Sequence, residues 1–270
     1  MVCINNGSFT GSEEVKRSES DQPVSVTYIG HATVLVESRY FRFITDPIFS
    51  KRVAHFFSRR KAPLEVSIED LPPIDSILIS HGHYDHLDAP TLKKFAKDTP
   101  IVVSKSLRKI IARLGFSDIR SLSWWEGTKI GKTEIIAVPA FHFSGRPPRL
   151  LRNDYQGYII EGEKIVYFAG DTGLQNDFEE IGEKFEIDLA LLPIGAYSPR
   201  SFRRHHLSPE DAIKAMELLK AKKMIPIHWG TFGLSFEPIT EPPERLAKIT
   251  KEYHLEDRVF ILKPGEMVEV

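Results

Sequence analysis

The sequence predicts an α/β fold in which two mixed β-sheets pack face to face and helices cover them on the outside. Strand-like runs follow one another closely near residues 24–45, and strand and helix patterns alternate later; this succession occurs twice along the chain. Such a layered arrangement buries the hydrophobic face of each sheet. The 270 residues with 41% hydrophobic content suffice for one large domain, expected over residues 23–270 after a flexible leader over residues 1–22.

The expected strands of the first half are short β-branched and aromatic runs bounded by breakers. They cover residues 24–29, 32–37, 41–45, 76–79 and 101–104. The spacing of apolar residues predicts helices over residues 89–96 and 107–114. The connection over residues 47–73 is long for a loop and carries basic side chains around two phenylalanines, so we expect it to border a functional site.

In the second half, strand and helix patterns alternate more regularly. Expected strands cover residues 122–125, 134–139, 155–160, 164–169, 188–192, 224–227 and 259–262, and expected helices cover residues 177–184, 208–220 and 243–254. The run Glu161-Gly162-Glu163 predicts a hairpin between two of these strands. Ser208, with Asp211 three residues later, fits a helix start with a capping box. Trp124 and Trp125 are adjacent, so within a strand one of them would face the core.

Charge and composition argue against several classes of protein. Lys and Arg total 36 against 37 Asp and Glu, so no bulk charge favours nucleic acid as a partner. The single cysteine, Cys3, allows neither an internal disulfide nor a metal site built on cysteines. No apolar run reaches the roughly 20 residues that span a bilayer. The N-terminus is polar where a secretory signal needs an apolar core, so we expect a cytoplasmic protein.

A candidate metal site follows the expected strand over residues 76–79. His81, His83, Asp85 and His86 place four ligand-type side chains within six residues. Imidazole nitrogen and carboxylate oxygen suit zinc, and a catalytic zinc keeps an open position for water. Two metals about 3.5–4 Å apart can share one hydroxide and stabilise both the attacking and the leaving oxygen. A solvated surface turn is the alternative interpretation of this cluster.

Further ligand-type residues end later strands. His142, Asp171 and His228 each follow an expected strand directly. Taken singly, such a histidine is more often packed or solvated than a ligand, but the nearby cluster reverses that judgement. Asp46 and Asp88 could orient ligand imidazoles through their carboxylates, or serve only in turns and caps.

The order of these ligands carries a resemblance. His-x-His-x-Asp-His followed by His, Asp and His resembles the metallo-β-lactamase superfamily over residues 24–268. Within it, the chain is similar to the N-acylphosphatidylethanolamine-hydrolysing phospholipase D group, although the basic stretch over residues 146–152 departs from that pattern. The matching segments are Gly30-His31-Ala32-Thr33, Thr45-Asp46-Pro47, Leu71-Pro72-Pro73-Ile74-Asp75, His83-Tyr84-Asp85-His86-Leu87-Asp88, Leu192-Pro193-Ile194-Gly195-Ala196-Tyr197, His206-Leu207-Ser208-Pro209-Glu210-Asp211-Ala212 and His228-Trp229-Gly230-Thr231-Phe232.

The resemblance implies a four-layer αββα sandwich that binds two zinc ions. One zinc would be held by His81, His83 and His142, the other by Asp85, His86 and His228, with Asp171 bridging them. Iron-binding relatives carry glutamate at the second histidine, so His83 favours zinc, although availability could load iron or manganese instead. A homodimer would also fit this group.

Other residues are candidates for catalysis and substrate contact. Asp85 is expected to orient the attacking hydroxide, and His206 matches a histidine near substrate in the resembled group, which implies a substrate contact or proton donor. Substrate contacts are also expected from His31, Arg59, Arg60 and Tyr197. For His31 the alternative is a structural hydrogen bond. For the basic loop, whose Phe56 and Phe57 would meet an acyl chain, the alternative is plain solvation.

These residues together predict a metal-dependent hydrolase. A metal-bound hydroxide would attack phosphorus while the metals offset the charge developing on its oxygens. The resemblance implies N-acylphosphatidylethanolamine as substrate, cleaved to phosphatidic acid and an N-acylethanolamine, with peripheral contact to a membrane surface. A sugar-phosphate lactonase or a nuclease of the same fold is the alternative enzyme, and a non-enzymatic metal-dependent scaffold or sensor is the alternative from another class.

Overall fold

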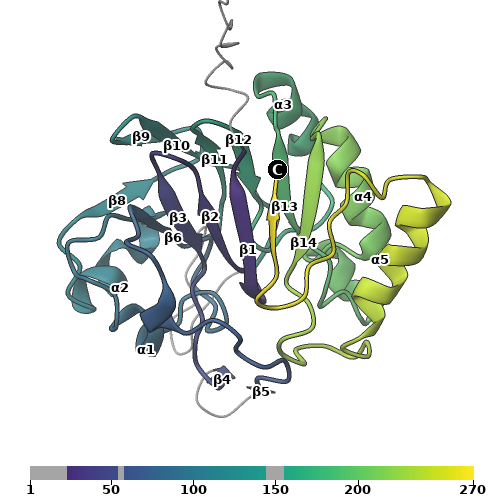
Figure 1. The fold of residues 1–270 in the computed structure, drawn as a ribbon, viewed down its shortest axis with the longest axis horizontal. Helices are drawn as coiled ribbons and strands as arrows, with labels where there is room; N and C mark the ends of the chain where they lie inside the picture. The colour runs from purple at the N-terminus through teal and green to yellow at the C-terminus, as the bar shows by residue number, and fades with distance from the viewer. Residues whose placement is uncertain (1–22, 54–57, 144–154) are drawn as a thin grey trace, which may run out of the picture.

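The fold has four layers, two β-sheets face to face with helices on both outer sides (Figure 1). The computed structural model describes residues 23–53, 58–143 and 155–270. The predicted αββα sandwich is confirmed. The leader expected over residues 1–22, with Cys3, lies outside the described residues, and the division of the chain at residue 23 stays a prediction.

The first sheet is mixed and contains seven strands. These are β1 (Ser25–Gly30), β2 (Thr33–Glu37), β3 (Arg42–Thr45), β6 (Ser76–Leu78), β7 (Ile101–Ser104), β8 (Ile119–Leu122) and β15 (Met267–Glu269). Their order is β15-β1-β2-β3-β6-β7-β8, antiparallel as far as β3 and parallel beyond it. Because β6 and β7 are covered on both faces, every residue in them is buried.

The second sheet is also mixed and contains six strands. These are β9 (Gly127–Ile130), β10 (Thr133–Val138), β11 (Gly157–Glu161), β12 (Ile165–Phe168), β13 (Leu189–Pro193) and β14 (Lys223–Ile227). Strands β9 to β12 pair antiparallel, whereas β12, β13 and β14 pair parallel. The predicted hairpin is confirmed as β11 and β12, whose register pairs Glu161 with Ile165.

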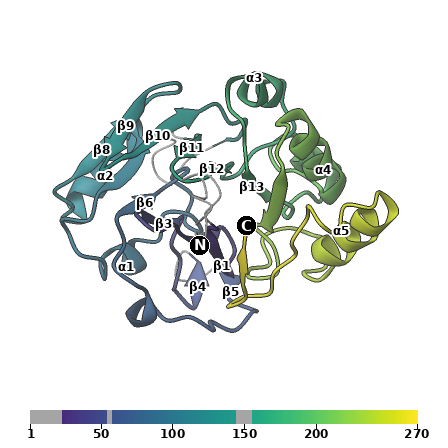
Figure 2. The same cartoon turned by 45° about the horizontal axis from the view of Figure 1, so that its top comes forward.

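Helices close the two outer faces. They are α1 (Ala89–Leu92), α2 (Arg108–Arg113), α3 (Asp177–Lys184), α4 (Pro209–Leu218) and α5 (Glu241–Glu252), with short 3-10 turns η2 (Ile68–Asp70), η3 (Lys105–Leu107) and η4 (Arg200–Arg204). Figure 2 shows α1 and α2 on one flank and α3, α4 and α5 on the other. Within the described ranges, no helix combines the length and the apolar character needed to cross a bilayer.

The hydrophobic core has three main parts, one between the sheets and one under each layer of helices. Tyr28 and Leu78 of the first sheet meet Tyr158 and Phe168 of the second in the central part. The Tyr158 hydroxyl donates to the carbonyl of Ile79 at 2.8 Å, so it fastens one sheet to the end of a strand in the other. This contact lies where the chain leaves the first sheet and leads into His81.

Several local expectations need correction. The helix expected over residues 89–96 stops at Leu92. Trp124 and Trp125 lie in a turn rather than in a strand, with exposed fractions of 42% and 37%, so neither belongs to the core. The strand expected over residues 259–262 is a single bridge between Val259 and Met224. Strands β9 and β15 were not expected, since glycine and charged residues weaken their patterns.

Other local expectations are confirmed. Helix α3 spans residues 177–184 as expected, and the Ser208 side chain caps α4 by accepting from the backbone N–H of Asp211. The long connection over residues 47–73 contains a small hairpin of β4 (Arg52–Val53) and β5 (Ser58–Arg59), whereas its residues 54–57 lie outside the described part.

Candidate metal centre

The ligand-type side chains gather at one end of the sandwich, where strands of both sheets stop. His81, His83, Asp85 and His86 lie between β6 and α1, His142 follows β10, Asp171 follows β12, and His228 follows β14. Loops from both sheets therefore supply the site, and the side chains meet although their positions in the sequence are far apart.

Three histidines form a first cluster. The Nε2 atom of His81 lies 2.8 Å from Nδ1 of His83, and Nε2 of His142 lies 3.2 Å from the same Nδ1. Burial lowers the pKa of all three histidines, those of His81 and His142 well below the usual value. Neutral imidazoles present lone pairs, so these three nitrogens are suited to bind one metal ion.

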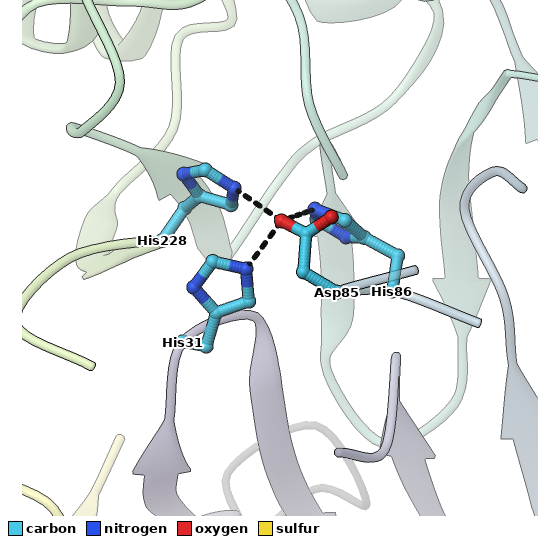
Figure 3. Close-up of side chains that lie close together, drawn as sticks. All are labelled: His31, Asp85, His86 and His228. Atoms are coloured by element: carbon cyan, nitrogen blue, oxygen red, sulfur yellow. Dashed lines mark hydrogen bonds and ion pairs between the residues drawn. The ribbon is translucent and has the colours of Figure 1, made fainter. Parts of the chain in front are cut away.

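A second cluster surrounds one oxygen of Asp85. Its Oδ2 atom lies 3.3 Å from Nε2 of His86, 3.4 Å from Nε2 of His228 and 2.9 Å from Nε2 of His31. Figure 3 shows the three histidines converging on this carboxylate from separate parts of the chain. These ligand atoms lie close enough to one another to hold a second metal ion.

Asp171 lies between the two clusters. Its Oδ2 atom is 3.2 Å from Nε2 of both His86 and His228, and 4.0 Å and 3.9 Å from Nε2 of His81 and His142. Burial alone would raise the pKa of the Asp171 carboxyl, but the positive charges of His228 and His86 outweigh burial and hold it well below its usual range. The carboxylate is therefore ionised and within reach of both clusters.

The buried atoms of the site fit a bound cation. The Nε2 atoms of His86 and His228 make no well-aligned hydrogen bond to a described residue, and neither does Oδ1 of Asp171. Leaving such buried groups unsatisfied costs about 1–3 kcal/mol each. The carboxylates also raise the pKa of His228 to about 9 against the opposing effect of burial. The site thus favours positive charge, which metal ions would supply.

Two of the ligand-type histidines are oriented from behind. Nδ1 of His86 lies 2.6 Å from Oδ2 of Asp46, whose two oxygens also accept the backbone N–H and the hydroxyl of Ser80. Nδ1 of His142 lies 3.0 Å from the carbonyl oxygen of His205. Such contacts leave the opposite ring nitrogen to face a metal. Asp46 thus has the geometry expected of an orienting carboxylate.

Asp88 is placed differently. Its Oδ2 accepts the hydroxyls of Ser50 and Thr91, each at 2.5 Å, so its observed contacts tie a loop to the start of α1.

His206 lies beside the site, with its Nδ1 3.8 Å from Oδ2 of Asp171, and burial lowers its pKa to about 4. Its ring faces His142 at 4.9 Å between centroids.

The residues expected to contact substrate occupy different surroundings. His31 is buried against Asp85, and burial lowers its pKa to about 3. The Arg60 guanidinium donates to the carbonyl of Ile48 and lies over Phe232, 5.0 Å from the ring centroid. Arg59 is exposed in β5.

The Tyr197 hydroxyl pairs with Glu241 at 2.8 Å. Phe56, Phe57 and residues 146–152 lie outside the described residues.

The structure adds aromatic side chains that sequence reasoning missed. Phe143 is 55% exposed, and its ring lies 5.2 Å from that of His83 and 4.8 Å from that of His142. Phe141 stacks on His205 with centroids 5.5 Å apart. The sequence signal for these aromatic residues was the run Phe141-His142-Phe143, which places both phenylalanines beside a candidate ligand at the end of a strand.

Two facing mixed sheets with histidine and aspartate clusters at their strand ends define the fold class of a metal-dependent hydrolase. The chain matches the family described as Beta-lactamase superfamily domain over residues 41–229. Together with the relatives below, this match shows that the chain belongs to the metallo-β-lactamase superfamily.

The comparisons also identify individual similar proteins. The chain is 37% identical, over 93% of its length and 77% of the relative's, to N-acyl-phosphatidylethanolamine-hydrolyzing phospholipase D 1 of Caenorhabditis elegans. The mitochondrial N-acyl-phosphatidylethanolamine-hydrolyzing phospholipase D of Saccharomyces cerevisiae is 34% identical, with 90% of this chain matching 55% of that protein. Among solved structures, Igni18, a metallo hydrolase from Ignicoccus hospitalis, superposes with a TM-score of 0.72, 26% identity, and coverage of 92% and 98%.

Proposed function

We propose that the protein is a dinuclear zinc phosphodiesterase of phospholipase D type that acts on N-acylphosphatidylethanolamine-like substrates. The observation that carries the proposal is the pair of buried clusters with Asp171 between them, in a chain 37% identical to a phospholipase D of this kind. The imidazole-rich ligand set suits zinc. We keep a cytoplasmic location and a homodimer as expectations, and a phospholipid substrate would require contact with a membrane surface.

Each residue has a proposed part in binding. His81, His83 and His142 would hold one zinc, Asp85, His86 and His228 the other, and Asp171 would contact both. When bound, the ions would lower the pKa of water and offset the charge developing on the phosphoryl oxygens. The buried setting strengthens these electrostatic effects because it excludes competing water.

The side chains around the metals would direct the reaction. Asp85 would orient the attacking water, whose oxygen forms a new bond to phosphorus. The bond from phosphorus to the oxygen of the N-acylethanolamine then breaks, and that oxygen takes up a proton released by the attacking water. His206, whose ring is neutral near pH 7 because burial lowers its pKa to about 4, would contact that oxygen or pass this proton to it. One water is consumed, and the products are phosphatidic acid and an N-acylethanolamine.

The test is product analysis with protein loaded with zinc. Vesicles containing N-acylphosphatidylethanolamine are incubated with the parent protein and with His83→Ala, and products are measured by mass spectrometry. A matched control is His254→Asn at an exposed histidine, since asparagine tolerates its positive φ of 54°. The proposal expects N-acylethanolamine from the parent and the control, and loss of most turnover in His83→Ala.

Other outcomes separate the remaining interpretations. Cleavage of a chromogenic phosphodiester without release of N-acylethanolamine would reject the phospholipid and favour a soluble phosphate ester. Opening of a sugar-phosphate lactone alone would favour the lactonase alternative. If none of these substrates is hydrolysed despite full zinc occupancy, the result would favour a non-enzymatic scaffold or sensor.

A further inference from the structure

We propose that His31 is a positioning residue for Asp85, in which the Nε2–H of His31 donates a hydrogen bond to Oδ2 of Asp85 and holds that carboxylate in the second metal site. The inference deepens the proposed function and rests on its claim that Asp85 binds a metal. The Nε2 to Oδ2 distance is 2.9 Å, the shortest of the three histidine contacts around that oxygen.

The direction of approach supports this role. Among the described residues, the histidine contacts of the Asp85 carboxylate all fall on the same oxygen, Oδ2. Figure 3 shows His31 reaching that oxygen from the turn after β1, whereas His86 and His228 come from other loops. If the Asp85 carboxylate rotated away from His31, its Oδ2 would also move away from the Nε2 atoms of His86 and His228, with which it would share a metal.

His31 is itself held in place by contacts of its backbone and its ring. Its backbone N–H donates to the hydroxyl of Thr231 at 2.8 Å, and its carbonyl accepts the backbone N–H of His228 at 2.8 Å. Its side chain is buried, and its ring meets the edge of Phe232 at 5.3 Å. The residue also has φ of 59°, a left-handed conformation that the surrounding contacts stabilise.

The number of ligands favours donation over direct coordination by His31. Asp85, His86, His228 and Asp171 already supply four ligand atoms to the second site, and the attacking water would add a further one, so a fifth protein ligand would exceed the coordination typical of zinc. Carboxylates that bind metals are commonly fixed by hydrogen-bond donors, and removing such a donor typically weakens metal affinity about 10–100-fold. His31 is in position to be that donor.

The test compares two replacements that differ in donor capacity. His31→Gln retains an N–H near the position of Nε2, whereas His31→Phe retains the packing of a ring and lacks a donor. Both place an ordinary side chain on the same left-handed backbone, so backbone strain is matched between them. Should His31→Phe fail to fold, His31→Met also lacks a donor and takes its place.

Metal binding is measured without reference to turnover. Zinc is titrated against a chelator, Co²⁺ absorption reports the coordination of each site, and thermal unfolding of the metal-free protein reports folding. For His31→Phe we expect the second equivalent of metal to bind about 10–100-fold more weakly and its Co²⁺ bands to change, with the first equivalent unaffected. For His31→Gln we expect affinity within about threefold of the parent.

Two results would overturn the inference. Parent-like binding of the second metal by His31→Phe would show that the hydrogen bond has no effect on Asp85. Equal loss in His31→Gln and His31→Phe, with unchanged unfolding of the metal-free proteins, would show that the imidazole itself is a ligand.

The same experiments distinguish this inference from the proposed function. A parent that binds two equivalents of metal but leaves N-acylphosphatidylethanolamine intact refutes the substrate and leaves the His31 comparison unchanged. A parent that binds fewer than two equivalents refutes both the dinuclear site and the role of His31.

Discussion

Replacing Asp46 by asparagine should weaken metal binding without changing the size of the side chain. Asp46 is fully buried, and its Oδ2 lies 2.6 Å from Nδ1 of His86 and accepts the Ser80 hydroxyl at 2.5 Å, while Oδ1 accepts the Ser80 N–H at 2.7 Å. The asparagine NH₂ must occupy one of these two positions. In either orientation the NH₂ group faces a hydrogen-bond donor of Ser80 or His86. The substitution also removes the negative charge behind His86.

The size of the effect follows from the contacts that are lost. A hydrogen bond to a charged group contributes about 1.5–3 kcal/mol, and about 1.4 kcal/mol corresponds to tenfold in affinity. We therefore expect Asp46→Asn to lower the affinity for the metal bound by His86 about 10–100-fold. Asp46 reaches the first cluster less directly, through the Ser80 hydroxyl, which lies 3.0 Å from Nδ1 of His81, so the metal of that cluster should be weakened less.

The assay is competition between the protein and a zinc chelator, with thermal unfolding measured in parallel. Asp88→Asn is the matched control, because Asp88 is also buried and hydrogen-bonded but its described partners, Ser50 and Thr91, are not ligand residues. The control should lose stability while binding both metals normally. Parent-like zinc affinity in Asp46→Asn, or an equal loss in Asp88→Asn, would refute this reasoning.

Four further predictions concern stability. The pKa of His228, about 9, exceeds its unfolded value, so its stabilisation is present below about pH 6.5 and is lost as pH rises through 9, at up to about 1.4 kcal/mol per pH unit; calorimetry should show this decline in metal-free protein only, and a flat profile there contradicts it. A metal chelator should lower the melting temperature, since ligand at 100 times its Kd stabilises by about 2.7 kcal/mol; an unchanged melt argues against metal binding. Ser208→Ala should destabilise by about 1 kcal/mol in urea unfolding, whereas Asn176→Ala, at a helix start without a side-chain cap, should have little effect; equal effects would reject the capping argument. Gly173→Ala should unfold at lower denaturant, because its new Cβ would lie 2.0 Å from the carbonyl oxygen of Arg204; unaltered stability would show that this close approach relaxes freely.

The sequence by itself determined the candidate ligand set and most regular elements of this protein. His81, His83, Asp85 and His86 are neighbours in the chain, and the remaining candidates directly follow strands that β-branched and apolar runs reveal. Helix α3 and the hairpin of β11 and β12 were equally visible because their periodicity and turn residues are local. The strand predicted at Trp124 and Trp125 was wrong. Their aromatic pattern is typical of a strand, but the backbone forms a tight turn there.

Only the tertiary structure decided how the candidate ligands are arranged and supported. Asp46 meets His86 across 40 positions of the chain, and His31 meets Asp85 across 54. No local pattern encodes such pairings, because they depend on how the strand ends and connecting loops pack together. The same packing places the Arg60 guanidinium against backbone carbonyls and Phe232, while its role as a substrate contact stays a prediction. Residue types thus define which chemistry is available, whereas the packing of the two sheets determines which side chains are close enough to perform it.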